Sequence, residues 1–388
     1  MPVFDEGDRT DDRPIAKGEG LFAFYDRISR RPCAVFRDMV NEWVAEMPAE
    51  TAAEIVARMR KGEDLGFTAG LSEIILHAAF CRLGFALDAH PEIPGTSNRP
   101  DFLVYRPSGE PLAYIEITTM NPPEAKVARD RREAVVFEAL NGATLPDDLR
   151  LRYQVESYGK ASPSVKNIRT AVERWAMKHA EAARGGRAIR ETFAVDDWCF
   201  DLALMSGFSP RPGGRQIAIY GVMNGRIVGA VPSTEGLAKA LDAKATKYGD
   251  LDLPFVIAVF DSTDSLACFS SDFPARVAEV LFGSERIEHV GEEQPRETRA
   301  ANGWFGLVGA PRRRGVSAVL VFPRAEPWFL AEPRGQPLLV RHPWATRPLP
   351  DGILPVNEFV IDEREGRVVA GRRMSEILDL PDPWPPLE

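Results

Sequence analysis

The chain has 388 residues, of which 44% are hydrophobic and 27% are charged. This composition is typical of a globular protein and excludes a long disordered polymer. Lys and Arg total 48 against 57 Asp and Glu, so the formal net charge is −9. That balance excludes a surface that is basic throughout, although it leaves room for a local basic groove.

Length and hydropathy limit the class of protein further. At roughly 150 residues per domain, the chain makes one large domain or two ordinary ones. No apolar run reaches the length of about 18 residues that a membrane-spanning helix needs, so we expect no membrane partner and a cytoplasmic protein. The cysteines form no CxxC pair and the histidines no HExxH motif, so reduced thiols are expected and zinc catalysis is not.

The N-terminal part is expected to be helical after an acidic tail. Residues 1–20 have no apolar centre, which predicts a disordered tail rather than a signal peptide. Residues 21–66 show apolar positions three and four apart, which predicts an N-terminal helical segment. A more apolar helix follows from Ser72 and is expected to stop at Gly84.

After Gly84 the pattern changes to alternating strands. Residues 67–185 are predicted to form helix, three strands, helix, strand and helix, with PSGE as the turn of a hairpin between the second and third strands. The core strands and helices are those around residues 72–84, 85–90, 101–106, 111–120, 121–142, 151–159 and 162–186. Residues 186–388 continue as an α/β extension that ends in an extended wrap rich in proline and tryptophan. The predicted fold class is therefore α/β, with a mixed central sheet flanked by helices.

Two carboxylates are expected to meet on the predicted hairpin. Asp101 follows Pro100 at the start of one strand, and Glu116 lies in the apolar centre of the next. Alternation places Tyr114, Glu116 and Thr118 on one face of that strand. A glutamate in an apolar strand is costly unless it is paired or binds a metal, and oxygen ligands of this kind suit Mg²⁺.

These residues resemble the motif of the PD-(D/E)xK nuclease superfamily, which has the restriction-endonuclease-like fold. Glu73 matches the acid of the first core helix, Pro100-Asp101 matches the PD pair, and Glu116-Ile117-Thr118 stands at the place of E-x-K. The resemblance covers roughly residues 70–180, under a third of the chain. It implies a DNA nuclease, by fold-level analogy one of bacterial genome defence.

Thr118 departs from the motif because threonine has no positive charge. One possibility is that a lysine from elsewhere in the chain enters the site. The alternative is that the protein no longer cleaves DNA and is an inactive binding or assembly module. The lysines considered are Lys126, Lys160 and Lys166 nearby in sequence, and Lys244 or Lys247 farther away.

An active site of this family implies specific roles. Asp101 and Glu116 would bind Mg²⁺ or Mn²⁺, and Glu73 would orient the attacking water, with Thr118 as the fourth catalytic position. Each residue also has a simpler interpretation. Asp101 suits a turn, Glu73 suits the first turn of a helix, Thr118 suits a strand, and the acids suit buried ion pairs with arginines such as Arg99.

Basic residues gather at three places where they could contact phosphates. They are RDRR at 129–132, the set Lys166, Arg169, Arg174 and Lys178, and the run 312–314. The spacing of the second set lets only part of it share a helix face. A solvated helix face explains these residues equally well. The partner expected is nucleic acid, DNA before RNA, and a homodimer is left open.

Overall fold

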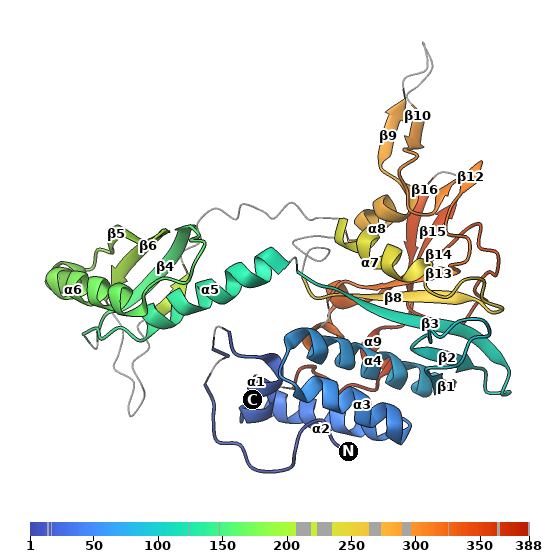
Figure 1. Ribbon diagram of the computed structural model, residues 1–388, viewed down its shortest axis with the longest axis horizontal. Helices are drawn as coiled ribbons and strands as arrows, with labels where there is room; N and C mark the ends of the chain where they lie inside the picture. The colour runs from blue at the N-terminus through green and yellow to red at the C-terminus, as the bar shows by residue number, and fades with distance from the viewer. Residues whose placement is uncertain are drawn as a thin grey trace. The chain divides into compact units, whose positions relative to one another are not determined.

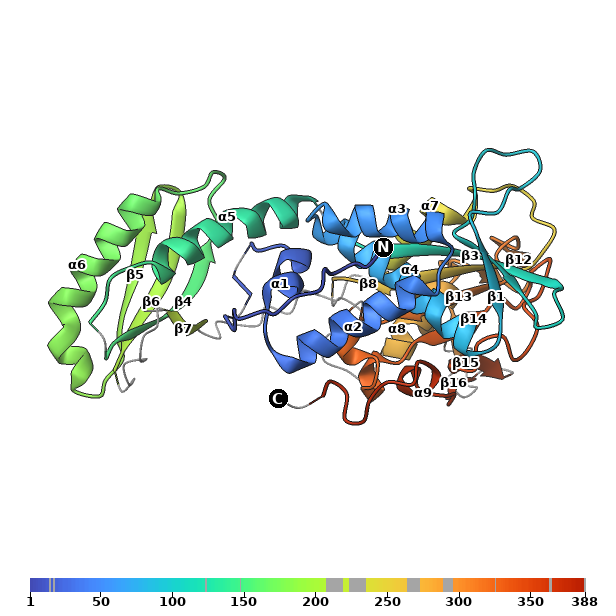
Figure 2. The same ribbon diagram turned by 90° about the horizontal axis from the view of Figure 1, so that it is seen from below.

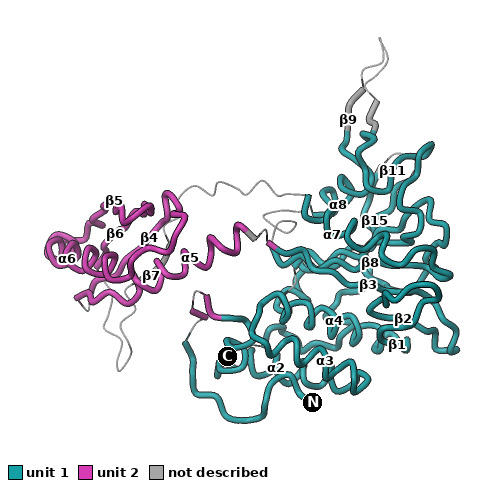
Figure 3. Tube along the Cα trace, viewed as in Figure 1, with its two compact units in different colours: residues 1–14, 20–121, 231–388 teal, residues 15–19, 122–230 magenta. Residues whose placement is uncertain are grey.

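A computed structural model describes residues 1–13, 15–16, 18–122, 124–146, 148–206, 219–222, 235–263, 273–288, 296–324, 326–362 and 365–386. The chain divides into two compact units (Figure 3). Unit 1 contains residues 1–14, 20–121 and 231–388, and unit 2 contains residues 15–19 and 122–230. This division differs from the sequence-based ranges, because the predicted core of 67–185 is cut after residue 121.

Unit 1 is built on a mixed sheet of eight strands in the order β1, β2, β3, β8, β13, β14, β15, β16. β1 to β3 pair antiparallel, and β3, β8 and β13 pair parallel. The bounds are β1 Ala86–Ala89, β2 Phe102–Tyr105, β3 Pro111–Met120, β8 Phe255–Asp261, β13 Ala318–Phe322, β14 Leu338–Arg341, β15 Asn357–Asp362 and β16 Glu365–Val369. The α/β class with a mixed central sheet is thereby confirmed.

Helices cover both faces of this sheet (Figures 1 and 2). One face packs against α4 Asp64–Arg82. The helices α1 Leu21–Arg27, α2 Arg31–Ala45 and α3 Ala49–Arg60 pack in turn on α4. The other packs against α7 Glu235–Ala245 and α8 Phe273–Phe282. Ile115 and Ile117 belong to the core on the α4 face, whereas Tyr114 belongs to the core on the α7 face. The predicted alternation of β3 is therefore confirmed, as is the helical N-terminal part.

Close packing holds α4 against α3. A Cβ atom added at Gly70 would lie 2.5 Å from Cγ of Met59, so only glycine lets the two helices approach this closely. Thirteen residues of α4 are buried between α3 and the sheet, which explains why its sequence is apolar on nearly every side.

The strand next to β3 is β8, not the strand predicted at 151–159. Every residue of β8 is buried, as a parallel strand covered on both faces requires. In β4 Arg150–Ser157, buried residues such as Leu151 and Tyr153 are separated by half-exposed ones, which suits a sheet with one open face. β4 belongs to unit 2.

Unit 2 contains a four-stranded sheet in the order β5, β6, β4, β7. The other strands are β5 Ile189–Val195, β6 Trp198–Met205 and β7 Ile219–Val222, and its helices are α5 Glu124–Asn141 and α6 Val165–Arg184. Val136, Val172, Trp198 and Leu202 contribute to a hydrophobic core formed by the helices and the sheet. Ser164 caps α6 by accepting a hydrogen bond from the backbone N–H of Asn167.

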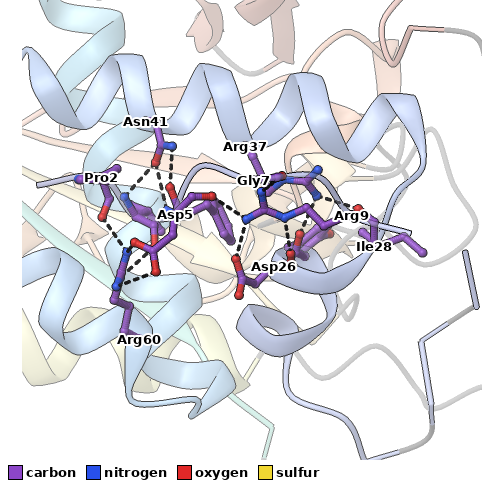
Figure 4. Close-up of polar contacts among 12 residues, drawn as sticks. Pro2, Asp5, Gly7, Arg9, Asp26, Ile28, Arg37, Asn41 and Arg60 are labelled. Carbon is purple, nitrogen blue, oxygen red and sulfur yellow. Dashed lines mark hydrogen bonds and ion pairs between the residues drawn. The ribbon is translucent and has the colours of Figure 1, made fainter. Parts of the chain in front are cut away.

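The first residues of the chain are packed against unit 1 and do not form the disordered tail expected for 1–20. Val3 and Phe4 are fully buried, and the side chain of Asn41 hydrogen-bonds the backbone of both (Figure 4). Arg60 donates to the Val3 carbonyl and pairs with Asp5. Two apolar side chains in an otherwise acidic stretch thus anchor it.

The C-terminal region contributes more regular structure than the extended wrap expected from its prolines. β14, β15 and β16 complete one side of the central sheet, and Trp384 donates its indole N–H to the Pro327 carbonyl. The remaining elements are β9 Glu285–Glu288, β10 Arg296–Arg299, β11 Gly306–Leu307, β12 Ala310–Pro311, the 3₁₀ helices Pro327–Phe329 and Pro333–Gly335, and α9 Met374–Ile377.

Two further expectations concern membranes and thiols. Within the described ranges, no helix has both the length and the apolar character to cross a bilayer. Cys33, Cys81 and Cys199 form no disulfide, and Cys268 lies outside the described residues.

Candidate functional site

Glu116 lies at the centre of β3 with only 1% of its surface exposed. Because it alternates with Ile115 and Ile117, its side chain points to the face of the sheet that α7 covers. An ionised carboxylate at this depth needs charged or hydrogen-bonding partners. The last turn of α7 and the residues after it provide them.

Three side chains contact the Glu116 carboxylate. Nζ of Lys244 lies 2.5 Å from Oε1, and Nζ of Lys247 lies 3.0 Å from the same oxygen. The hydroxyl of Tyr248 donates a hydrogen bond to Oε2. Burial, followed by this contact with Glu116, raises the pKa of Tyr248 well above that of an ordinary phenol. Both oxygens of Glu116 therefore accept hydrogen bonds from this segment.

Asp101 lies across the hairpin from Glu116. Phe102 pairs with Ile115, so one residue further the register places Asp101 opposite Glu116. Its Oδ2 accepts a hydrogen bond from the backbone N–H of Ile117 at 2.6 Å. Burial, then the negative charges of Glu116 and Glu73, raise the pKa of Asp101 to about 7. The Ile117 N–H and the Lys244 ammonium act in the opposite direction but are weaker.

Glu73 lies on α4, on the other face of the sheet, and is bound by an arginine. Nη2 of Arg58 on α3 lies 2.6 Å from its Oε1. Burial raises the pKa of Glu73 more than the Arg58 charge lowers it. The expected ion pair between a buried acid and an arginine thus occurs, but the partner is Arg58. The guanidinium of Arg99 pairs with Glu92 instead.

The structure brings some of the four predicted site residues together and leaves others apart. Asp101 and Glu116 are neighbours across β2 and β3, and Glu73 is close enough to influence the charge of Asp101. Thr118 pairs in register with Val259 and forms no side-chain hydrogen bond with another described residue. In the part of the chain that the structure describes, no three His, Cys, Asp or Glu side chains are grouped closely enough to hold a metal ion.

Among the lysines considered as substitutes for the motif lysine, the distant pair reaches Glu116. Lys244 and Lys247 belong to unit 1 and contact the acid directly. Lys126, Lys160 and Lys166 belong to unit 2, where Lys126 pairs with Asp130.

Sequence reasoning missed Tyr248 and Arg58. A signal for the first was present, because Lys244, Lys247 and Tyr248 lie close together at the end of α7 and just after it, shortly before the apolar run at 255–260. The carboxyl end of a helix favours lysine, and residues three apart share one side of it. Nothing in the sequence distinguished Arg58 from the other arginines of α3.

The donor set suits a hard divalent cation held by few protein ligands. Mg²⁺ is commonly bound by one or two carboxylates and keeps several waters. Asp101 and Glu116 supply two carboxylates side by side, and burial, followed by repulsion from Glu116, raises the pKa of Asp101. A cation bound by Glu116 would compete with the two lysines for Oε1.

The arginine run 312–314 is partly used within the protein. Arg313 pairs with Asp242, and Arg314 donates to the Trp344 carbonyl. In the run 129–132, Arg129 likewise pairs with Asp130 and lies over the ring of Tyr158.

Comparisons of the chain with models of protein families, with curated proteins and with solved structures found no match.

Proposed function

We propose that this protein is a Mg²⁺- or Mn²⁺-dependent nuclease of the PD-(D/E)xK type that hydrolyses phosphodiester bonds in DNA. The observation that carries the proposal is the contact of buried Glu116 with Lys244 and Lys247, directly across the hairpin from Asp101. The resemblance implies a lysine next to the acid of β3. In this chain that lysine comes from α7 and not from position 118.

The order of elements supports the same assignment. The family core is expected to run helix, three strands, helix, strand, and in unit 1 this order is α4, β1, β2, β3, α7, β8. Unit 2 occupies the chain between β3 and α7. The helix and strand assigned to this core from sequence, α5 and β4, are replaced by α7 and β8.

The chain's own residues have distinct roles in this proposal. Asp101 and Glu116 would hold the divalent cation, which would stabilise negative charge on the phosphate and lower the pKa of water. Lys244 and Lys247 supply positive charge next to Glu116 and would offset the charge that develops on the phosphate. Tyr248 holds the Glu116 carboxylate in position. Glu73, paired with Arg58, adds negative charge near Asp101 and thereby favours cation binding.

The test is cleavage of supercoiled plasmid with Mg²⁺ or Mn²⁺. The variants are Asp101→Asn, Glu116→Gln and Lys244→Met, with Glu110→Gln as the matched control, because Glu110 is an exposed acid in the turn of the same hairpin. We expect the first three to lose activity by about 100-fold or more and the control to keep it. Equal cutting by all five proteins would identify a contaminating nuclease and end the proposal.

A second candidate is a nuclease-fold module that binds nucleic acid without cutting it. It is favoured by one observation, which is that both oxygens of Glu116 already accept hydrogen bonds from Lys244, Lys247 and Tyr248. Mn²⁺ calorimetry separates the two. Heat that depends on both Asp101 and Glu116 supports the enzyme, whereas DNA binding without any Mn²⁺ heat supports the inactive module.

A further inference from the structure

Unit 2 differs in charge from the rest of the chain. Residues 122–230 contain 17 Lys and Arg against 13 Asp and Glu, a net charge of +4 within a protein of net charge −9. The other residues together carry −13. A positive segment in an acidic protein concentrates attraction for anions in one place.

The exposed side of α6 carries a row of basic side chains. Lys166, Thr170, Arg174 and Lys178 follow one another at intervals of four residues and are all exposed, so they form one row along the helix. We call these four residues the basic stripe. At 1.5 Å per residue the stripe is about 18 Å long.

Arg169 of the same helix does not belong to this stripe. Nε of Arg169 donates to the Ala139 carbonyl of α5, so this arginine packs between the helices. The opposite side of α6 is apolar, with Ile168, Val172 and Trp175 in the core of unit 2.

The acids of α6 do not neutralise the stripe. Glu173 accepts a hydrogen bond from the Thr144 N–H, and Glu181 pairs with Arg184. Lys166, Arg174 and Lys178 form no ion pair with any described residue. Arg174 and Lys178 are moreover like charges four residues apart, an arrangement that destabilises a helix. Repulsion within the stripe therefore destabilises α6 slightly, and a bound anion would remove this repulsion.

We propose that the basic stripe of α6 binds the phosphate backbone of double-stranded DNA without reading its sequence. Lysine, arginine and threonine are typical phosphate-contacting side chains. No aromatic side chain belongs to the stripe, and Trp175 of the same helix is buried. Binding of single strands usually depends on aromatic stacking, so a duplex is the better fit. This inference rests on the proposed function, since it assigns to unit 2 the task of holding the substrate.

The test measures binding of the full chain to a short duplex of mixed sequence, without divalent cations so that nothing is cut. The variant is Lys166→Gln/Arg174→Gln/Lys178→Gln. The matched control is Arg31→Gln/Lys61→Gln/Arg373→Gln, which removes the same charge from exposed residues of unit 1 that lack ion pairs with described residues. We expect the stripe variant to bind more than about tenfold more weakly near physiological salt, and its salt slope to fall by about three.

The outcomes separate this inference from the nuclease proposal. Loss of duplex binding in the stripe variant alone supports the stripe, even if the wild-type protein never cuts DNA. Equal binding by variant and control overturns it, whether or not the protein is a nuclease. A loss seen only with single strands, or only with anionic vesicles, also overturns it. Unchanged thermal unfolding of the variant ensures that the effect is not a folding defect.

Discussion

Nζ of Lys244 lies 2.5 Å from Oε1 of Glu116, although 128 residues separate the two in sequence. The contact arises because β3 and β8 pair in parallel and α7, which precedes β8, packs on the face of β3 to which Glu116 points. A helix between two parallel strands is the usual connection in such a sheet. The topology thus brings a distant lysine to a carboxylate whose own strand has threonine, Thr118, at the position of the motif lysine.

This relationship predicts a strong dependence of stability on the ion pairs. Lys244→Met/Lys247→Met leaves Glu116 buried with only Tyr248 as a partner, and removing the partners of a buried charge costs about 3–5 kcal/mol. Adding Glu116→Gln to the double variant is expected to recover much of that loss. Urea unfolding measures each free energy of unfolding, and strictly additive effects would contradict the pairing.

The pKa of Asp101 predicts how cation affinity depends on pH. Because only the ionised carboxylate binds a cation, and its pKa is about 7, Mn²⁺ affinity should rise about tenfold per pH unit from pH 5 toward 7 and then level off. Calorimetry in buffers of different ionisation enthalpy should detect about one proton released at pH 6. A wild-type affinity that is flat over this range would exclude Asp101 as a ligand with this pKa.

The same group predicts a pH dependence of stability. The folded pKa of about 7 exceeds the ordinary value of 3.8, so the native protein retains a proton that the unfolded chain releases. The resulting stabilisation is complete below about pH 4 and is lost as the pH rises through about 7, by on the order of a few kcal/mol. In Asp101→Asn this part of the pH profile should disappear. A profile unchanged by the substitution would show that Asp101 titrates normally.

The buried N-terminus predicts that the first residues matter for stability. Phe4→Ala removes a fully buried ring next to Phe22, Phe36 and Phe67 and should cost about 3–5 kcal/mol. Ile15→Ala, at an exposed position, is the control and should be nearly neutral. Thermal unfolding of the two variants provides the measurement. Similar melting temperatures would restore the view that residues 1–20 are a loose tail.

The parts of the fold that depend on local pattern could be predicted from the sequence. The hairpin of β2 and β3, the face on which Glu116 lies and the cap at Ser164 all follow from alternation, turn residues or capping preference. Pairing between distant segments could not be predicted. Several strands follow β3 in the sequence, and burial on both faces distinguishes β8 from the first of them, β4.

The site was predictable to the same extent. The acids lie on neighbouring strands and were found by their spacing, whereas Lys244 could be named only as one of several lysines. Its assignment required knowing which helix covers β3. The pairing of Glu73 with Arg58 depends in the same way on the packing of α3 against α4.

The position of unit 2 within the chain also has a consequence for biosynthesis. A ribosome completes β3 with Asp101 and Glu116, then makes all of residues 122–230, and only afterwards adds α7 and β8. Until then Glu116 has neither its lysines nor the strand that covers its edge. Because domains generally fold as units during synthesis, the inserted unit can form its own core first. A nascent chain therefore carries the segment with the basic stripe before it has a complete acid–lysine centre.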